Sequence, residues 1–258
     1  MSDDQFTIVA CVNNDDVLQK NLLLSPGLLN GGRNQLALKR GFSAASVAYN
    51  SAIEEAENDI VIFVHQDVYL PDTWFTDLKR CLVSLEAAGA NWGVLGCYGF
   101  RKGRDGGLGH VYTRGLGRHG RKITRPEPVE TLDEIILILR KSSGLRFDSR
   151  LPHFHLYGTD ICMTARERGL VSYAFQGYCV HNTNQLLILP KEFYTCYRLI
   201  RRKWAHELPI HTSCIKISLL NEQFHVRRLI EAKQRMFGMR SRPAKRVEDP
   251  RVFSNQFD

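Results

Sequence analysis

The feature that most constrains the fold is an apolar run that ends abruptly in a polar triplet. Residues 60–64 read IVIFV and are followed at once by His65, Gln66 and Asp67. Five consecutive apolar residues, most of them β-branched, predict a strand buried on both faces, as in the middle of a parallel sheet. Ligands bind outside the carboxyl ends of such strands. We therefore expect the triplet at a binding site, the alternative being that Asp67 only caps the next turn.

The surrounding segments alternate between strand and helix patterns. Strands are expected at residues 6–12 and 92–97, and helices at residues 45–56 and 72–89. Ser43 and Asp72 are the expected N-caps of the two helices, and Gly89 is placed to end the second. This alternation predicts an α/β fold, a Rossmann-type three-layer domain with a mainly parallel or mixed sheet.

Four short motifs, in this order, resemble a known group of enzymes. They are residues 44–53, residues 63–68, Phe147-Asp148 with residues 154–162, and Val180-His181. Their order and spacing over residues 6–182 are similar to those of the family 2-like glycosyltransferases of the GT-A fold, in a bacterial-type branch with His-Gln-Asp in place of Asp-x-Asp. His65 stands where the family at large has an acid, and Thr159 where it often has Glu. The resemblance implies sugar transfer, with inversion, from a nucleotide-sugar donor.

The resemblance also implies a divalent cation, manganese or magnesium, with Asp67 and His181 as its ligands. A diphosphate leaving group needs positive charge beside its developing oxyanions, and a bound metal ion supplies it. Carboxylate oxygens suit both ions, and imidazole is compatible with manganese. For His181 the alternative is an ordinary histidine at a strand end.

Asp160 is implied as the catalytic base that deprotonates the acceptor hydroxyl. Residues 161–168 predict a helix that Gly169 closes. A carboxylate at a helix start is expected to stay ionised, because free backbone amides favour the anion. The alternative is that Asp160 only caps this helix.

Other donor-binding residues are expected at two strand ends and on one helix. With the triplet, the set comprises Asn13, Asp15, Asp16, Asn50, His65, Gln66 and Asp67. The residues that follow the first strand would bind the base and ribose, although polar loops after strands are common. Asn50 matches a family asparagine that faces the nucleotide.

Two further groups rank lower. Asp133 and Glu134 precede the apolar run 135–139 and mark another strand edge near the acceptor side. His153 and His155 could form a zinc triad with His181. A lone His-x-His is a weak metal signal, so acceptor contact or surface exposure is favoured for that pair.

Composition divides the chain at residue 190. Residues 1–190 hold 20 basic and 20 acidic side chains, whereas residues 191–258 hold 15 and 7. We therefore expect a GT-A-like domain over 1–190 and a basic helical extension over 191–258, with a disordered end beyond Arg240. Residues 98–130, rich in glycine and arginine, predict a mobile loop. Basic helices with aromatic anchors lie on anionic membranes or bind nucleic acid, and packing against the domain is the favoured alternative.

Composition also limits the location and the function class. No apolar stretch approaches the roughly 18 residues that cross a bilayer, and residues 1–4 differ from a secretory signal. A cytoplasmic protein is expected, with peripheral contact at the inner face of the membrane through the C-terminal helices. Seven cysteines without a Cys-x-x-Cys pair indicate reduced thiols.

The expected partners are the nucleotide-sugar donor and a glycan, lipid-linked or protein acceptor. A catalytically inactive protein that binds nucleotide sugars or glycans is the first alternative, since His65 and Thr159 depart from the family pattern. A nucleic-acid-binding protein is the second. No nucleic acid is expected as a partner, because the positive charge is confined to the tail and the loop and no recognition motif is present.

Overall fold

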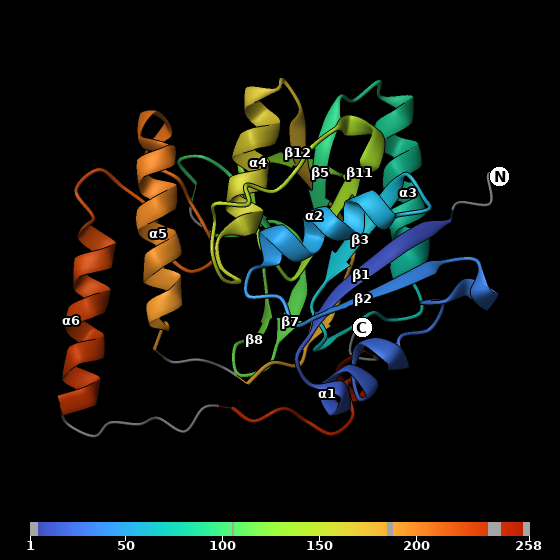
Figure 1. Cartoon of the computed structure of the whole chain (residues 1–258), viewed down its shortest axis with the longest axis horizontal. Helices are drawn as coiled ribbons and strands as arrows, with labels where there is room; N and C mark the ends of the chain where they lie inside the picture. The colour runs from blue at the N-terminus through green and yellow to red at the C-terminus, as the bar shows by residue number, and fades with distance from the viewer. Residues whose placement is uncertain (1–4, 105, 185–187, 237–243, 255–258) are drawn as a thin grey trace.

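The computed structural model describes residues 5–104, 106–184, 188–236 and 244–254, and its centre is a seven-stranded mixed sheet (Figure 1). In spatial order the strands are β2 (Gln35–Arg40), β1 (Phe6–Val12), β3 (Ile60–Val64), β11 (Ile136–Arg140), β5 (Trp92–Gly96), β12 (Val171–Ala174) and β9 (Glu127–Val129). β1 is parallel to β2 and β3, and β5 is parallel to β12. β11 is antiparallel to β3 and β5. The predicted α/β fold with a mixed sheet is confirmed.

Helices cover both faces of this sheet. They are α1 (Asp15–Gln19), α2 (Ala45–Glu55), α3 (Trp74–Ala87), α4 (Tyr157–Glu167) and α5 (Lys191–Lys203). A sixth helix, α6 (Glu222–Met236), packs through Phe224 on α5. Successive side chains of a strand point to opposite faces. Val61 and Phe63 therefore enter a core with α2, α4 and α5, whereas Ile62 and Val64 enter a second core with α1 and α3. The result is three layers.

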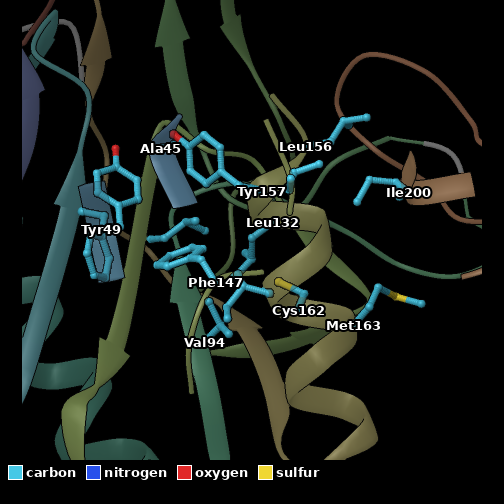
Figure 2. Packing of buried hydrophobic residues seen from close by; sticks show 14 of the residues in the cluster. Ala45, Tyr49, Val94, Leu132, Phe147, Leu156, Tyr157, Cys162, Met163 and Ile200 are labelled. Atoms are coloured by element: carbon cyan, nitrogen blue, oxygen red, sulfur yellow. The ribbon is translucent and has the colours of Figure 1, made fainter. Parts of the chain in front are cut away.

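The first core is built from aromatic rings and includes the first basic helix. The Tyr49 ring lies 4.6 Å from Phe63 and 5.5 Å from Tyr157, measured between centroids. Figure 2 shows Tyr49, Tyr157 and Ile200 among the residues of this cluster. Ile200 belongs to α5, and α5 also buries Trp204 at its end. The beginning of the predicted extension therefore packs into the core of the domain.

Residues 98–130 differ from the predicted mobile loop, because they contain short strands. β7 (Val111–Thr113) and β8 (Gly117–His119) join β4 (Val68–Tyr69) and β13 (Val180–His181) in a four-stranded sheet. β6 (Gly99–Phe100) pairs with β10 (Thr131–Leu132). Gly109 permits this folding, since a Cβ there would lie 1.9 Å from the Cys97 carbonyl oxygen. The glycines thus bring backbone segments together.

Three helix starts differ from those predicted. α2 has Ala44 as its N-cap instead of Ser43, and the Ala45 amide donates to the His153 carbonyl oxygen at 2.9 Å. α3 begins at Trp74 after Thr73, without a side-chain cap from Asp72. α4 begins at Tyr157, because Leu156 adopts a left-handed φ of 62°.

The end of the chain also differs from the prediction. Residues 244–254 have a defined course and include a 3-10 turn, Pro250–Phe253. The Phe253 ring stacks on Tyr112 at 4.0 Å between centroids, and this apolar contact holds the segment against the small sheet. The expectation of disorder beyond Arg240 is therefore wrong for residues 244–254. Residues 241–243 and 255–258 lie outside the described residues.

Candidate functional site

The carboxyl ends of β1 and β3 are tied together by Gln66. Its Oε1 accepts hydrogen bonds from the backbone amides of Asn13, at 3.1 Å, and Asn14, at 3.2 Å. The strands are parallel neighbours, so both ends open on the same edge of the sheet. The two polar strand ends recognised in the sequence therefore lie side by side.

A pocket of about 390 Å³ opens at this edge. Its lining is Cys11, Val12, Asn13, Lys39, Gly41, Phe42, Tyr49, His65, Gln66, Asp67 and Phe154. Asn13 and all three residues of the His-Gln-Asp triplet thus line one pocket, and their binding to the donor stays a prediction. Phe42 and Phe154 add aromatic faces, and Phe154 is 38% exposed. Such rings can stack on a nucleobase or a sugar.

His65, Asp67 and His181 converge beside this pocket. One ligand atom from each lies within 4.8 Å of the others, in a cluster found among the described residues. Asp67 is 7% exposed, and its Oδ1 lies 3.5 Å from His181 Nε2. The pairing of β13 with β4 sets His181 opposite Val68 and so beside Asp67. The sequence pointed to Asp67 and His181 as metal ligands, but it assigned His65 only to the donor.

The groups in this cluster shift one another's pKa values. Burial alone would raise the pKa of Asp67, but His181, His65 and the Arg246 guanidinium hold that pKa below its usual range. Burial would lower the pKa of His181, yet the Asp67 carboxylate outweighs it and raises that pKa. Burial and the neighbouring His181 lower the pKa of His65. The carboxylate is therefore ionised beside at least one neutral imidazole.

One carboxylate and two imidazoles fit a divalent transition ion such as manganese better than magnesium, which prefers oxygen ligands alone. The His181 Nδ1 atom is buried without a hydrogen-bond partner among the described residues. Such an atom is costly to leave unsatisfied unless another group binds there. The donor set of His65, Asp67 and His181 is thus compatible with a bound cation.

Asp160 lies in the first turn of α4 rather than at an N-cap. It is 2% exposed. Lys203 donates to Oδ2 at 2.9 Å and Trp204 Nε1 donates to Oδ1 at 2.7 Å. Burial raises the pKa of Asp160, and Lys203 and Trp204 only partly oppose this. The expectation that helix amides dominate its ionisation is therefore wrong, since burial is the larger effect. Neither α5 partner was foreseen.

The remaining donor candidates lie outside the pocket lining. Asp15 forms an ion pair with Arg40, and Asp16 lies 2.9 Å from Lys20, all at the surface. Asn50 accepts from the Phe147 amide at 2.9 Å and donates to the Phe147 carbonyl oxygen at 2.8 Å. The amide oxygen and nitrogen of Asn50 thus both bind the backbone at Phe147.

Glu134, which the sequence ranked low, lies next to the start of α4. Its Oε1 accepts from the Gly158 amide at 3.3 Å. Tyr157 Oη donates to the Glu134 carbonyl oxygen at 3.3 Å and lies 2.8 Å from His65 Nε2. Burial and the neighbouring Asp133 raise the pKa of Glu134 to about 8. The zinc triad considered from the sequence, His153 and His155 with His181, is not the arrangement found. The possible metal ligands grouped with His181 among the described residues are His65 and Asp67.

Among characterised sequences, the chain is similar to a protein described as "ATP synthase subunits region ORF 6" from Fuscovulum blasticum. The two are 32% identical over 130 residues, which are 47% of this chain and 50% of that protein. The chain therefore spans about half the length of the curated relative that it matches. No protein-family profile matches it.

Among solved structures, S. aureus TarS 1-349 aligns at 14% identity with a TM-score of 0.47, over 77% of this chain and 65% of that chain. The same protein in complex with UDP-GlcNAc aligns at 14% identity with a TM-score of 0.43, over 77% and 66%. A197 from STIV aligns at 12% identity with a TM-score of 0.40, over 67% and 82%. Alignments at these scores do not define a function for this chain.

Proposed function

We propose that this protein is a glycosyltransferase that moves a sugar from a nucleotide-sugar donor to an acceptor hydroxyl. The observation that carries the proposal is the convergence of His65, Asp67 and His181 beside a pocket where two parallel strands end. The order of the sequence motifs supports the same reading. The pocket lining combines polar strand-end groups with the aromatic residues Phe42 and Phe154, which suits a nucleoside with its phosphates.

In this proposal the chain holds the diphosphate beside Asp67. His65, Asp67 and His181 would hold a divalent cation, manganese in preference to magnesium, and when bound it would supply positive charge to the leaving diphosphate. Asn13 and Gln66 fix the pocket wall against the nucleoside, because they join the ends of β1 and β3. Phe154 offers a face for stacking at the exposed side.

Asp160 is our candidate for the base of an inverting transfer. Asp160 is 2% exposed and accepts from Lys203 of α5 and from Trp204, the C-cap of that helix, so Lys203 and Trp204 must move before an acceptor hydroxyl can reach the buried carboxylate. The same burial favours a second candidate function, a protein that binds nucleotide sugars without transferring them. Hydrolysis or transfer of a radiolabelled sugar by the full chain separates the two functions.

The acceptor is proposed as a glycan, a lipid-linked sugar or a protein, met at the inner face of the membrane in the cytoplasm. Within the described residues, no helix combines the length and apolar character needed to cross a bilayer. The proposed contact is peripheral and involves the basic helix α6.

The test is calorimetric titration of UDP-sugars and other nucleotide sugars into the wild type and Asp67→Asn, with manganese and with a chelator. We expect the wild type to bind one donor at least about tenfold more tightly with manganese, and the variant to lose this gain, because the charge that attracts the cation is removed. Asp77→Asn is the matched control, since Asp77 lies on α3 away from the pocket lining. Equal, metal-independent binding by all three proteins would refute the role of Asp67.

A further inference from the structure

The last described segment, residues 244–254, returns to the candidate site (Figure 1). Asn182, which follows β13, donates from Nδ2 to the Val247 carbonyl oxygen and accepts from the Val247 amide, both at 2.9 Å. Asn182 is 1% exposed and also donates to Asn21 Oδ1 at 2.8 Å. A buried amide side chain that pairs with a backbone in this way fixes its position.

The neighbouring residues of the segment are held in the same way. The Arg246 amide donates to Asn184 Oδ1 at 3.0 Å. Arg114 Nε donates to the Lys245 carbonyl oxygen at 2.8 Å. Hydrogen bonds therefore anchor the backbone on both sides of Arg246 to residues that follow β7 and β13.

The Arg246 side chain reaches Asp67. Its Nη2 donates to Asp67 Oδ2 at 2.9 Å, and the side chain is 28% exposed. Its Nε is buried and has no hydrogen-bond partner among the described residues. A guanidinium offers five N–H groups in a rigid fork. Arg246 thus approaches the cluster with donor capacity that its protein contacts leave unused.

This arrangement suits an anion better than it suits a plain structural ion pair. Asp67 Oδ2 accepts from Arg246, and Asp67 Oδ1 lies 3.5 Å from His181 Nε2, so the guanidinium meets one oxygen of a carboxylate that it shares with the metal-ligand cluster. A guanidinium that a carboxylate already holds in place binds phosphate oxygens with two parallel hydrogen bonds at little further cost in order. Positive charge fixed in advance beside a leaving diphosphate also favours its departure.

We infer that Arg246 forms the diphosphate subsite of the donor pocket, carried there by the C-terminal segment. The inference rests on the proposed function, because it names the residue that binds the phosphates of the same donor. In this arrangement Arg246 acts beside the cation ligands and supplies positive charge whether or not a cation is bound.

The experiment measures the binding of inorganic pyrophosphate, UDP and uridine by calorimetry, in the presence of a chelator. Arg246→Ala is expected to weaken the binding of pyrophosphate and of UDP by about 10- to 100-fold, the range for lost hydrogen bonds between charged groups. The binding of uridine should be unchanged, because uridine has no phosphate. Arg251→Ala is the matched control. Arg251 lies in the same segment but pairs with Asp249, so its loss should change no affinity by more than about twofold.

A second variant and a second ligand distinguish an Arg246 that binds the anion from an Arg246 that only orients Asp67. Arg246→Lys keeps the charge and the reach to Asp67 but loses the fork, so pyrophosphate should bind with intermediate affinity. Manganese alone is titrated into each protein. If Arg246 only orients Asp67, its removal should weaken the binding of manganese and of pyrophosphate together. If Arg246 binds the anion, its removal should leave manganese binding unchanged or stronger.

Wild-type affinity for pyrophosphate and UDP in folded Arg246→Ala or Arg246→Lys would overturn the inference while the proposed function stands. Parallel loss of manganese and pyrophosphate in Arg246→Ala would overturn it as well. Loss of pyrophosphate binding in Arg246→Ala, together with no binding of any nucleotide sugar by the wild type, would refute the proposed function and leave the anion site.

Discussion

Asp67 and Asp160 are both buried carboxylates, yet their neighbours move their pKa values in opposite directions. Asp67 is surrounded by two imidazoles and a guanidinium, which outweigh burial and lower its pKa. Asp160 has Lys203 and the Trp204 indole, which do not outweigh burial, and its pKa is raised. A lowered pKa suits a group that attracts cations at all physiological pH values, whereas a raised pKa suits a group that gains a proton.

Asp160→Asn tests the proposed role of Asp160 as the catalytic base. We expect transfer to slow by about 10²- to 10⁴-fold with donor affinity little changed, since a general base acts in the transition state. Asp148→Asn is the control, because Asp148 also pairs with Lys203, at 2.9 Å, without being a candidate base. Steady-state kinetics and calorimetry provide the readouts. Loss of folding stability by about 3 kcal/mol or more, with activity falling only in proportion to folded protein, would identify Asp160 as an anchor for α5.

Glu134 gives a prediction for pH. Its pKa in the folded protein is about 8, above its ordinary value of 4.5, so the folded state holds a proton that the unfolded state has released. Its stabilising effect is therefore full below about pH 4.5 and is lost as pH rises through about 8. From this group, the free energy of unfolding should fall by at most about 1.4 kcal/mol per pH unit in that window.

Glu134→Gln mimics the protonated form, so we expect a flatter dependence of stability on pH between 5 and 9. Urea denaturation at several pH values measures it. Glu86→Gln, an exposed change on α3, should leave the slope as in the wild type. A slope that Glu134→Gln does not alter would mean that Glu134 is ionised throughout this range.

At the scale of elements, α6 exposes an apolar row that the domain does not cover. Val226 is 55% exposed, Leu229 65% and Ile230 50%. Tyr194 of α5 contacts Phe224 on the other side of α6, so the helix is attached by one face only. In Figure 1, α5 and α6 stand together at one edge of the molecule. Exposed apolar residues beside arginines are typical of helices that lie on anionic membranes.

Leu229→Asp tests this contact. We expect it to weaken sedimentation with phosphatidylserine vesicles by about tenfold. The change removes apolar surface that would enter the membrane and adds a negative charge that the anionic lipids repel. Val83→Asp on α3 makes the same change at a residue that is 62% exposed, and it should have a smaller effect. Equal sedimentation of both variants and the wild type would exclude α6 as the docking helix.

Elements were predictable from sequence where one local pattern decides them. The runs at 6–12, 60–64 and 92–97 became β1, β3 and β5, because an apolar stretch of this length is buried in a sheet whatever its neighbours are. β2 was missed, since its residues are mostly half-exposed at a sheet edge and alternate little in polarity. The start of α4 was also missed, because no local pattern marks the left-handed Leu156.

The candidate site was predictable only in part, for a related reason. Asp67 follows β3 by three residues and His181 ends β13, so their positions follow from the order of strands. The partners of Asp160 and Asp67 in α5 and the C-terminal segment depend on packing between distant parts of the chain. Lys203 and Arg246 stand in basic stretches where each arginine or lysine looks equivalent. Only the folded backbone selects one of them.

For the whole molecule, the compositional boundary at residue 190 falls within one core. Phe193, Tyr197, Ile200 and Trp204 are buried in the cluster that also holds α2 and α4. Truncating one buried aromatic residue costs about 3–5 kcal/mol, and a domain has only about 5–15 kcal/mol in total. We therefore do not expect residues 1–190 to fold independently, although their composition differs from that of the remainder.

A chain shortened to residues 1–190 should lack a cooperative urea transition and the near-ultraviolet circular dichroism of packed aromatic rings. A chain shortened to residues 1–236 keeps α5 and α6 and is the control, which should unfold cooperatively. A cooperative transition in the shorter protein would show that the compositional boundary is also a folding boundary.

The hydrogen bond between Asp67 and Arg246 joins residues 179 positions apart. A ribosome adds about 5–20 residues per second, so Asp67 is made on the order of ten seconds or more before Arg246 exists. During that time the nascent chain already contains β1, β3 and all of the pocket lining except Phe154, but the guanidinium that meets Asp67 has not been synthesised. If Arg246 binds the donor diphosphate, synthesis itself sets a delay, because a growing chain reaches its full affinity for the donor only after almost all of the residues described here have been translated.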